Sequence, residues 1–106
     1  MRDLMGIMKQ AQAMQEKMQD VQAELDRTEV EGAAGGGMVK IVLTAKGEAK
    51  SVKIDPSLLN PDEAEIVEDL VLAALNDARA KADRAAQEKM EEVTKGLPLP
   101  PGLKLF

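Results

Sequence analysis

The chain has 106 residues, which predicts one domain over residues 1–106, and its formal net charge is −5. It contains no cysteine and no histidine, which excludes disulfides, thiolate or imidazole metal sites and catalysis by either side chain. Aliphatic side chains must build the core, because aromatic residues are only 1% of the sequence. We find no apolar run of about 20 residues and no signal-peptide pattern, so we expect a cytoplasmic protein without a membrane span.

Residues 1–27 are predicted to form a helix that packs lengthwise on another helix. Apolar residues recur there at alternating spacings of three and four, which is the period of a coiled-coil seam. Met and Ala replace the Leu and Ile of a tight zipper, so we expect the partner surface to include more than this helix. The predicted dimer seam consists of Leu4, Ile7, Ala11, Met14, Met18, Val21 and Leu25.

Residues 28–54 are predicted to form three strands, the first of them around Val30. The glycine-rich segment 32–37 follows, and it raises the possibility of a phosphate loop. Such a loop needs Lys and then Ser or Thr after its last glycine, where this chain has Met38 and Val39. We therefore favour a connection between strands over a nucleotide site.

A hairpin is predicted over residues 38–54, with its tip at Lys46-Gly47. A two-residue turn at that tip fixes which residues face one another across the two strands. One face is then apolar and is expected to pack on the helices. The expected pairs are Val39 with Ile54, Ile41 with Val52, Leu43 with Lys50, and, on the other face, Val42 with Ser51 and Lys40 with Lys53.

The opposed Lys40 and Lys53 are expected to repel each other, since like charges directly opposite destabilise a strand pair. Two arrangements relieve that repulsion. An acid of the first strand, Glu29 or Glu31, can lie between the lysines, or an external anion can bind there. We favour neutralisation by the neighbouring strand, which is the more common fate of surface charges.

A long second helix is predicted over residues 61–95, after a cap and a first-turn proline at Asn60-Pro61. At ~1.5 Å per residue it is about 50 Å long, whereas a compact domain of this size has a radius of gyration of about 13 Å. Part of the helix must therefore project or pair with another subunit. Acids crowd its first two turns, as the helix dipole favours, and we predict no metal site and no cofactor.

The two helices are expected to form a slender arm that carries cations. Lys81, Arg84 and Lys95 share one flank of the second helix, but each has an acid four residues away, so spacing alone favours salt-bridged helix faces over phosphate contacts. Lys9 has no acid three or four residues away and is expected to be a freer cation. The acids four residues from Lys81, Arg84 and Lys95 are Asp77, Glu88 and Glu91, respectively.

Several short motifs follow one another over almost the whole chain. They are Lys9–Gln12, Met14–Gln19, Gly37–Lys40, Lys53–Leu59, Glu68–Val71, Ala74–Ala78 and a Leu-Pro-x-Pro-Pro-Gly sequence within the tail, residues 97–106. In this order the motifs resemble the YbaB/EbfC family of bacterial nucleoid-associated proteins. Ile-Asp-Pro-Ser-Leu-Leu is a specific part of that resemblance.

The resemblance implies an α+β fold, helix–three-stranded antiparallel sheet–long helix, in a homodimer whose helical arms project like tweezers. It implies a non-enzymatic protein of the cytoplasm and nucleoid that binds double-stranded DNA, alters DNA conformation and contributes to nucleoid organisation and gene regulation. It implies no small-molecule substrate. We expect phosphate contacts with little sequence specificity, because the chain shows no helix-turn-helix, zinc or basic-zipper pattern. The candidate phosphate contacts are Lys9, Lys17, Arg79, Lys81, Arg84, Lys89 and Lys95.

An alternative function is a protein-interaction module. The Met-rich seam of the first helix and the Pro-rich tail at 97–106 would then dock partner proteins. The two hypotheses differ in how binding is expected to depend on ionic strength. Binding to DNA through cations weakens steeply as ionic strength rises, and docking through apolar surfaces does not.

Overall fold

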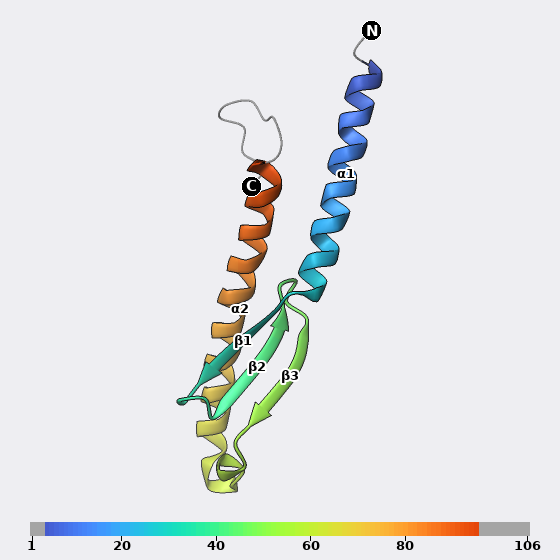
Figure 1. Ribbon diagram of the computed structural model, residues 1–106. Helices are drawn as coiled ribbons and strands as arrows, with labels where there is room; N and C mark the ends of the chain where they lie inside the picture. The colour runs from blue at the N-terminus through green and yellow to red at the C-terminus, as the bar shows by residue number, and fades with distance from the viewer. Residues whose placement is uncertain (1–3, 96–106) are drawn as a thin grey trace.

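The computed structural model describes residues 4–95, and the side chains of residues 4–93. The elements are α1 (Leu4–Arg27), β1 (Glu29–Ala34), β2 (Val39–Thr44), β3 (Ala49–Ile54) and α2 (Ala64–Lys95), with 3-10 turns at Pro56–Leu58 and Pro61–Glu63 (Figure 1). The strands form one antiparallel sheet in the order β1-β2-β3. The predicted α+β fold is confirmed. The tail at 97–106 lies outside the described residues.

The long helix begins three residues later than predicted. Asn60 caps this segment as expected, because its side-chain oxygen accepts a hydrogen bond from the Asp62 amide at 3.2 Å. The residues that follow the cap first form a tight 3-10 turn, and the α-helical ladder starts only at Ala64. Such turns are common at helix N-termini.

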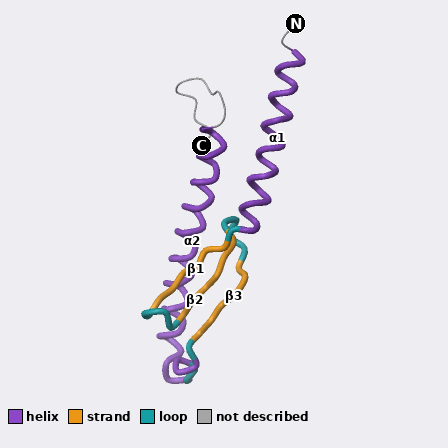
Figure 2. The backbone as a smooth tube through the Cα atoms, viewed as in Figure 1, coloured by secondary structure: helices purple, strands orange, loops and turns teal. Residues whose placement is uncertain are grey.

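The core lies between one face of the sheet and α2 (Figure 2). β2 contributes the alternating residues Val39, Ile41 and Leu43, which are buried against Ala74 and Ala78 of α2. The helix packs mainly on β1 and β2. β3 lies at one edge of the sheet and has mostly exposed side chains, and Val52 remains 55% exposed although its register places it on the apolar face.

The glycine-rich segment is in part a strand. β1 continues through Gly32, which pairs with Ile41, and only residues 35–38 connect β1 to β2. Gly32 lies directly against α2, where a Cβ atom would overlap the carbonyl oxygen of Ala74 and the amide nitrogen of Ala78. The glycine therefore belongs to the core, where it allows the helix to approach the sheet.

The predicted hairpin forms, with four of its five expected pairs. Val39, Lys40, Ile41 and Val42 pair as predicted, but Leu43 faces Ala49 instead of Lys50. The turn spans residues 45–48, closed by hydrogen bonds between Thr44 and Glu48, so it is longer than the expected Lys46-Gly47 turn. The extra length is absorbed by a bulge at Lys50, which shifts the register by one residue.

The expectation that an acid neutralises Lys40 and Lys53 is wrong. The two lysines are paired as predicted, but the β1 residue opposite Lys40 is Ala33, while Glu31 pairs with Val42. Within residues 4–93, neither lysine forms an ion pair. The register of β1, which the sequence did not define, places Glu31 two residues away from the position opposite Lys40.

A second cluster joins the two helices beyond the sheet. Val21 and Leu25 of α1 are buried with Ala45 of the hairpin tip and Val93 of α2. α1 then continues away from the sheet beside the end of α2 (Figure 1). The molecule measures 73 × 24 × 16 Å and has a radius of gyration of 20.0 Å, which confirms the expected elongated shape.

Side chains of α2 occupy the outer edge of β1. A carboxylate oxygen of Asp77 accepts hydrogen bonds from the Ala33 amide at 3.0 Å and from Lys81 at 3.2 Å, and Lys81 donates to the Glu31 carbonyl at 2.8 Å. The backbone bond from Ala33, aided by Lys81, lowers the pKa of Asp77 below its ordinary value. This arrangement blocks the β1 edge against pairing with another strand.

Replacement of Gly32 by alanine is predicted to destabilise the fold by about 1–3 kcal/mol, because the added methyl group must push α2 away from the sheet. The matched control is Gly6→Ala on α1, where the added Cβ meets no described atom beyond its chain neighbours and the nearby backbone of its own helix. That change is expected to be neutral or to stabilise by about 0.5–1 kcal/mol, since glycine is disfavoured in helices. Urea denaturation of both variants measures the difference. Equal stabilities would show that the helix tolerates a wider spacing.

Asp77→Asn is predicted to lower stability at pH 7 and to flatten the acid limb of the stability curve. Because the native pKa is depressed, the wild-type carboxylate contributes stability above its unfolded pKa of about 3.9, and this is lost as pH falls through the lower native pKa. Denaturant titrations between pH 7 and pH 3 should show the two proteins converging. Asp20→Asn, at an exposed residue outside the described ion pairs, serves as the control. If the free energies of unfolding of the two proteins differ by the same amount at every pH, the charge of Asp77 does not stabilise the fold.

Candidate nucleic-acid interface

Two of the predicted cations lie on the projecting part of α1. Lys9 and Lys17 are exposed, and neither forms an ion pair in the part of the chain that the structure describes. They are separated by eight residues, or about 12 Å along the helix. Both charges are therefore available to an anionic partner.

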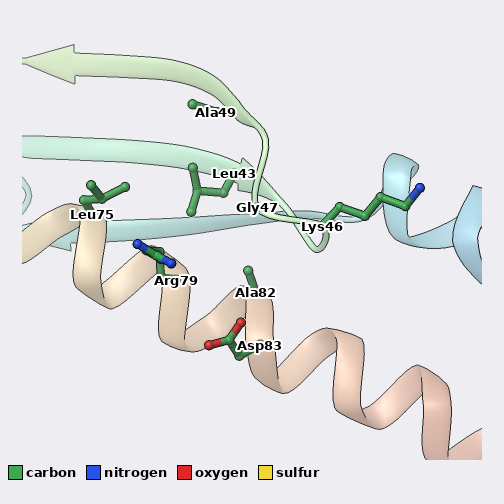
Figure 3. A pocket seen from close by; sticks show the side chains of 8 residues that line it. All are labelled: Leu43, Lys46, Gly47, Ala49, Leu75, Arg79, Ala82 and Asp83. Atoms are coloured by element: carbon green, nitrogen blue, oxygen red, sulfur yellow. The ribbon is translucent and has the colours of Figure 1, made fainter.

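Two further cations, Arg79 and Arg84, lie on α2, and both are exposed. Arg79 and Asp83 border a cavity of about 380 Å³ between α2 and the β2–β3 tip, together with Leu43 and Leu75 (Figure 3). Spacing predicts a pair between Arg84 and Glu88, but within residues 4–93 this pair does not form. Both arginines remain outside the described ion pairs.

Lys81 and Lys89 are engaged in contacts between elements. Lys81 makes the pair with Asp77 that its spacing predicts and also joins α2 to β1. Lys89 pairs with Glu24 of α1 at 3.1 Å and with Glu92 at 4.0 Å. The hydrogen bond that Lys89 donates to Glu24, followed by the charges of Glu24 and Glu92, raises the pKa of Lys89 above its ordinary value. Lys81 therefore holds α2 to the sheet and Lys89 holds α2 to α1, so both lysines are less available for phosphate.

The side chain of Lys95, at the end of α2, lies outside the described residues. Sequence reasoning missed three other cations that are exposed and form no ion pair within residues 4–93. Arg27 ends α1, and Lys40 and Lys53 lie opposite each other on the sheet. The predicted strand register placed Lys40 and Lys53 opposite each other correctly. They were not among the candidate phosphate contacts because an acid of the first strand was expected to neutralise them.

The predicted dimer seam is divided by the structure. At one end, Val21 and Leu25 are only 7% and 5% exposed, because they pack on α2 and the hairpin tip of the same chain. At the other end, Leu4 and Ile7 are 55% and 60% exposed. Met14 and Met18 are half-buried, and Ala11 is exposed. The exposed end of the seam is the part that a second chain has room to cover.

The charges are separated along the molecule. Residues 55–78 hold seven acids and no Lys or Arg, and they lie at the end of the molecule opposite the projecting helices (Figure 1). Among the described residues, no group of three or more acidic side chains is arranged to hold a metal ion, and no helix is long and apolar enough to cross a membrane. The arrangement offers dispersed cations on an extended surface, which suits a polyanion.

Comparison with known proteins identifies relatives over the whole length of the chain. "Nucleoid-associated protein" of Methylocella silvestris is 58% identical over 105 residues, which cover 99% of this chain and 98% of that protein. A protein of Nitrobacter hamburgensis with the same name is 60% identical over 105 residues, with 99% of both chains covered.

A solved structure supports the fold. The uncharacterized protein HP0035 from Helicobacter pylori superposes with a TM-score of 0.69 at 23% identity, over 89% of this chain and 95% of that one. The sequence model of the YbaB/EbfC DNA-binding family matches residues 1–97. The resemblance drawn from the short motifs is thereby confirmed, and this chain belongs to the YbaB/EbfC family of nucleoid-associated, DNA-binding proteins.

Proposed function

We propose that this protein binds double-stranded DNA as a homodimer in the bacterial nucleoid, mainly through the phosphate backbone and with little sequence preference. Its binding alters DNA conformation and thereby contributes to nucleoid organisation and gene regulation. The function is binding without catalysis. The observation that carries the proposal is the set of cations outside the described ion pairs along the elongated helical part of the molecule, Lys9, Lys17, Arg79 and Arg84.

The separation of charge supports DNA binding by a protein whose net charge is −5. The acid-rich segment 55–78 is remote from the exposed end of α1 (Figure 1). Over such a distance the acids act weakly, because the Debye length is about 8 Å at physiological ionic strength. The cations of α1 therefore meet phosphate with little opposition from this region. The net charge still predicts modest affinity that fades as salt rises.

The exposed end of the α1 seam supports a homodimer. Leu4 and Ile7, with their neighbours Met5 and Met8, leave apolar side chains exposed on the projecting part of the helix. Burial of such side chains in a second copy contributes about 1.5–3 kcal/mol for each large residue. Pairing of two chains in this way brings two sets of arm cations to one duplex.

Lys9→Gln/Lys17→Gln is predicted to weaken binding to a short duplex of arbitrary sequence about tenfold at low salt. It should also reduce the slope of log Kobs against log salt by about 0.9 for each phosphate that the protein no longer neutralises. Fluorescence anisotropy over a salt series measures both quantities.

The matched control is Lys46→Gln/Lys50→Gln, which removes the same charge from lysines that are already paired with Asp26 at 3.3 Å and Glu48 at 3.8 Å. Its salt slope should match the wild type. Equal losses of affinity in the two double variants would mean that overall charge, and not contact by α1, governs binding. A wild-type protein that fails to bind any duplex at low salt would exclude the proposed function.

Leu4→Gln/Ile7→Gln is predicted to raise the dimer dissociation constant at least tenfold, since it removes apolar area from the exposed end of the seam. Sedimentation velocity over a concentration series measures the change. The control is Ile66→Gln/Leu72→Gln, which removes two apolar side chains of α2 that are 50% and 58% exposed. If the dimer dissociates only in the control variant, the dimer interface lies on α2 and not on α1.

Protein docking is the second candidate function, and the exposed apolar end of α1 favours it. The seam would then bind a different protein through the same residues, Leu4 and Ile7. Retention of a partner in high salt, together with no affinity for duplex DNA, would select this alternative, because apolar contacts are little weakened by salt.

A further inference from the structure

The outer face of the sheet carries a pair of cations that the proposed function does not use. Lys40 and Lys53 are direct partners in the β2–β3 ladder, and both side chains are exposed. Side chains of directly opposite residues start from Cβ atoms about 4.5–5.5 Å apart. α2 covers the other face of the sheet, so it does not screen these two charges.

No acid within residues 4–93 forms an ion pair with either lysine. The position on β1 beside Lys40 is occupied by Ala33, whose methyl group leaves space and brings no charge. The ion pairs that the hairpin does form involve Lys46 and Lys50, which lie toward its tip. Two like charges held opposite each other destabilise the folded chain. An external anion removes that cost when it binds.

The surface beside the pair has a concave shape. A cavity of about 200 Å³ is bordered by both lysines and by residues of the β1–β2 turn and the end of β3, among them Gly37, Met38 and Ile54. This volume is several times the roughly 30 Å³ that one water molecule occupies in the liquid, so a phosphate group has room. Its position at the sheet surface leaves it open to a macromolecule.

One acid, Asp55, borders the same cavity. Its carboxylate is turned into the following 3-10 turn, where it accepts a hydrogen bond from the Ser57 amide at 2.9 Å. It forms no ion pair with Lys40 or Lys53 in the described part of the chain. The hydrogen bonds from Ser57 lower the pKa of Asp55, so this carboxylate is ionised at neutral pH and is held by the turn that follows β3.

We propose that Lys40 and Lys53 together bind a phosphate group of the DNA backbone on the outer face of the sheet. This inference rests on the proposed DNA binding and adds a contact outside the helical arm. Lys40 lies about 14 Å down β2 from the hairpin tip, and Lys9 lies about 27 Å up α1 from Arg27. These lengths place the two contacts about 40 Å apart along the molecule, so that one protomer engages DNA at two separate places.

The test compares Lys40→Gln/Lys53→Gln with the control Lys46→Gln/Lys50→Gln, which changes the net charge equally. The first variant should bind a short duplex about three- to tenfold more weakly than wild type, with a salt slope smaller by about 0.9 for each phosphate left without its lysine. Its thermal midpoint should equal or exceed that of wild type, because the variant is freed of a repulsion. Weaker binding by a protein that is at least as stable cannot arise from unfolding.

Other outcomes overturn the inference. Unchanged binding by Lys40→Gln/Lys53→Gln, while Lys9→Gln/Lys17→Gln is weakened, rejects the sheet contact and leaves the proposed function intact. A change in oligomeric state by sedimentation would assign the lysines to the subunit interface instead. No duplex binding by wild type rejects both proposals together.

A titration with inorganic phosphate distinguishes the two sources of the anion. The thermal midpoint of wild type is followed as phosphate replaces chloride at constant ionic strength. If phosphate stabilises wild type but not Lys40→Gln/Lys53→Gln, and the variant binds duplex normally, the site takes free phosphate and the DNA assignment is wrong. Weakened duplex binding in the variant supports the backbone phosphate.

Discussion

α2 packs unusually close to the sheet at Gly32, and this contact positions the elements around it. The helix presents the small residues Ala74 and Ala78 to a strand that has no Cβ at the contact. A short distance between the layers brings Asp77 and Lys81 to the edge of β1, where they bond to its backbone. The fixed position of α2 on the sheet also sets the direction in which its second half leaves the core toward α1.

The same packing decides which surfaces remain open. β1 has its outer edge occupied by side chains of α2, and β3 is an exposed edge strand. Of the cations, Lys81 and Lys89 hold elements together, while Lys9, Lys17, Arg79 and Arg84 lie on the helices without ion pairs in residues 4–93. Lys9 and Lys17 on α1 are remote from the acid-rich segment 55–78, whereas Arg79 directly follows that segment. The proposed DNA binding depends on this separation. Salt screens the distant acids, so they oppose the contact between phosphate and the cations of α1 only weakly.

The strand register places Lys40 and Lys53 opposite each other, which makes a pair of cations on one face of the sheet. Alternation of apolar residues on β2 and β3 places both lysines on the face away from α2. The pairing of β1 then puts Ala33, and not an acid, beside them. A surface that bears an unrelieved repulsion is well suited to an anionic ligand, since binding removes the destabilisation that the free protein carries.

Sequence patterns alone were enough to predict the element order, the elongated shape and the family. The element order and the shape follow from local patterns: a seam period in α1, alternation in β2, a cap at Asn60 and an overlong α2. The family follows from the resemblance of the ordered short motifs. The sequence also predicted most of the hairpin register, but the bulge at Lys50 depended on a longer turn between Thr44 and Glu48. Which cations of residues 4–93 are free of ion pairs depends on contacts between elements. Lys81 and Lys89 are bound by residues 50 and 65 positions away, Glu31 and Glu24, and Arg84 lacks the partner that its spacing suggested. Ion pairing depends on distances between elements, and local spacing along one helix does not contain them.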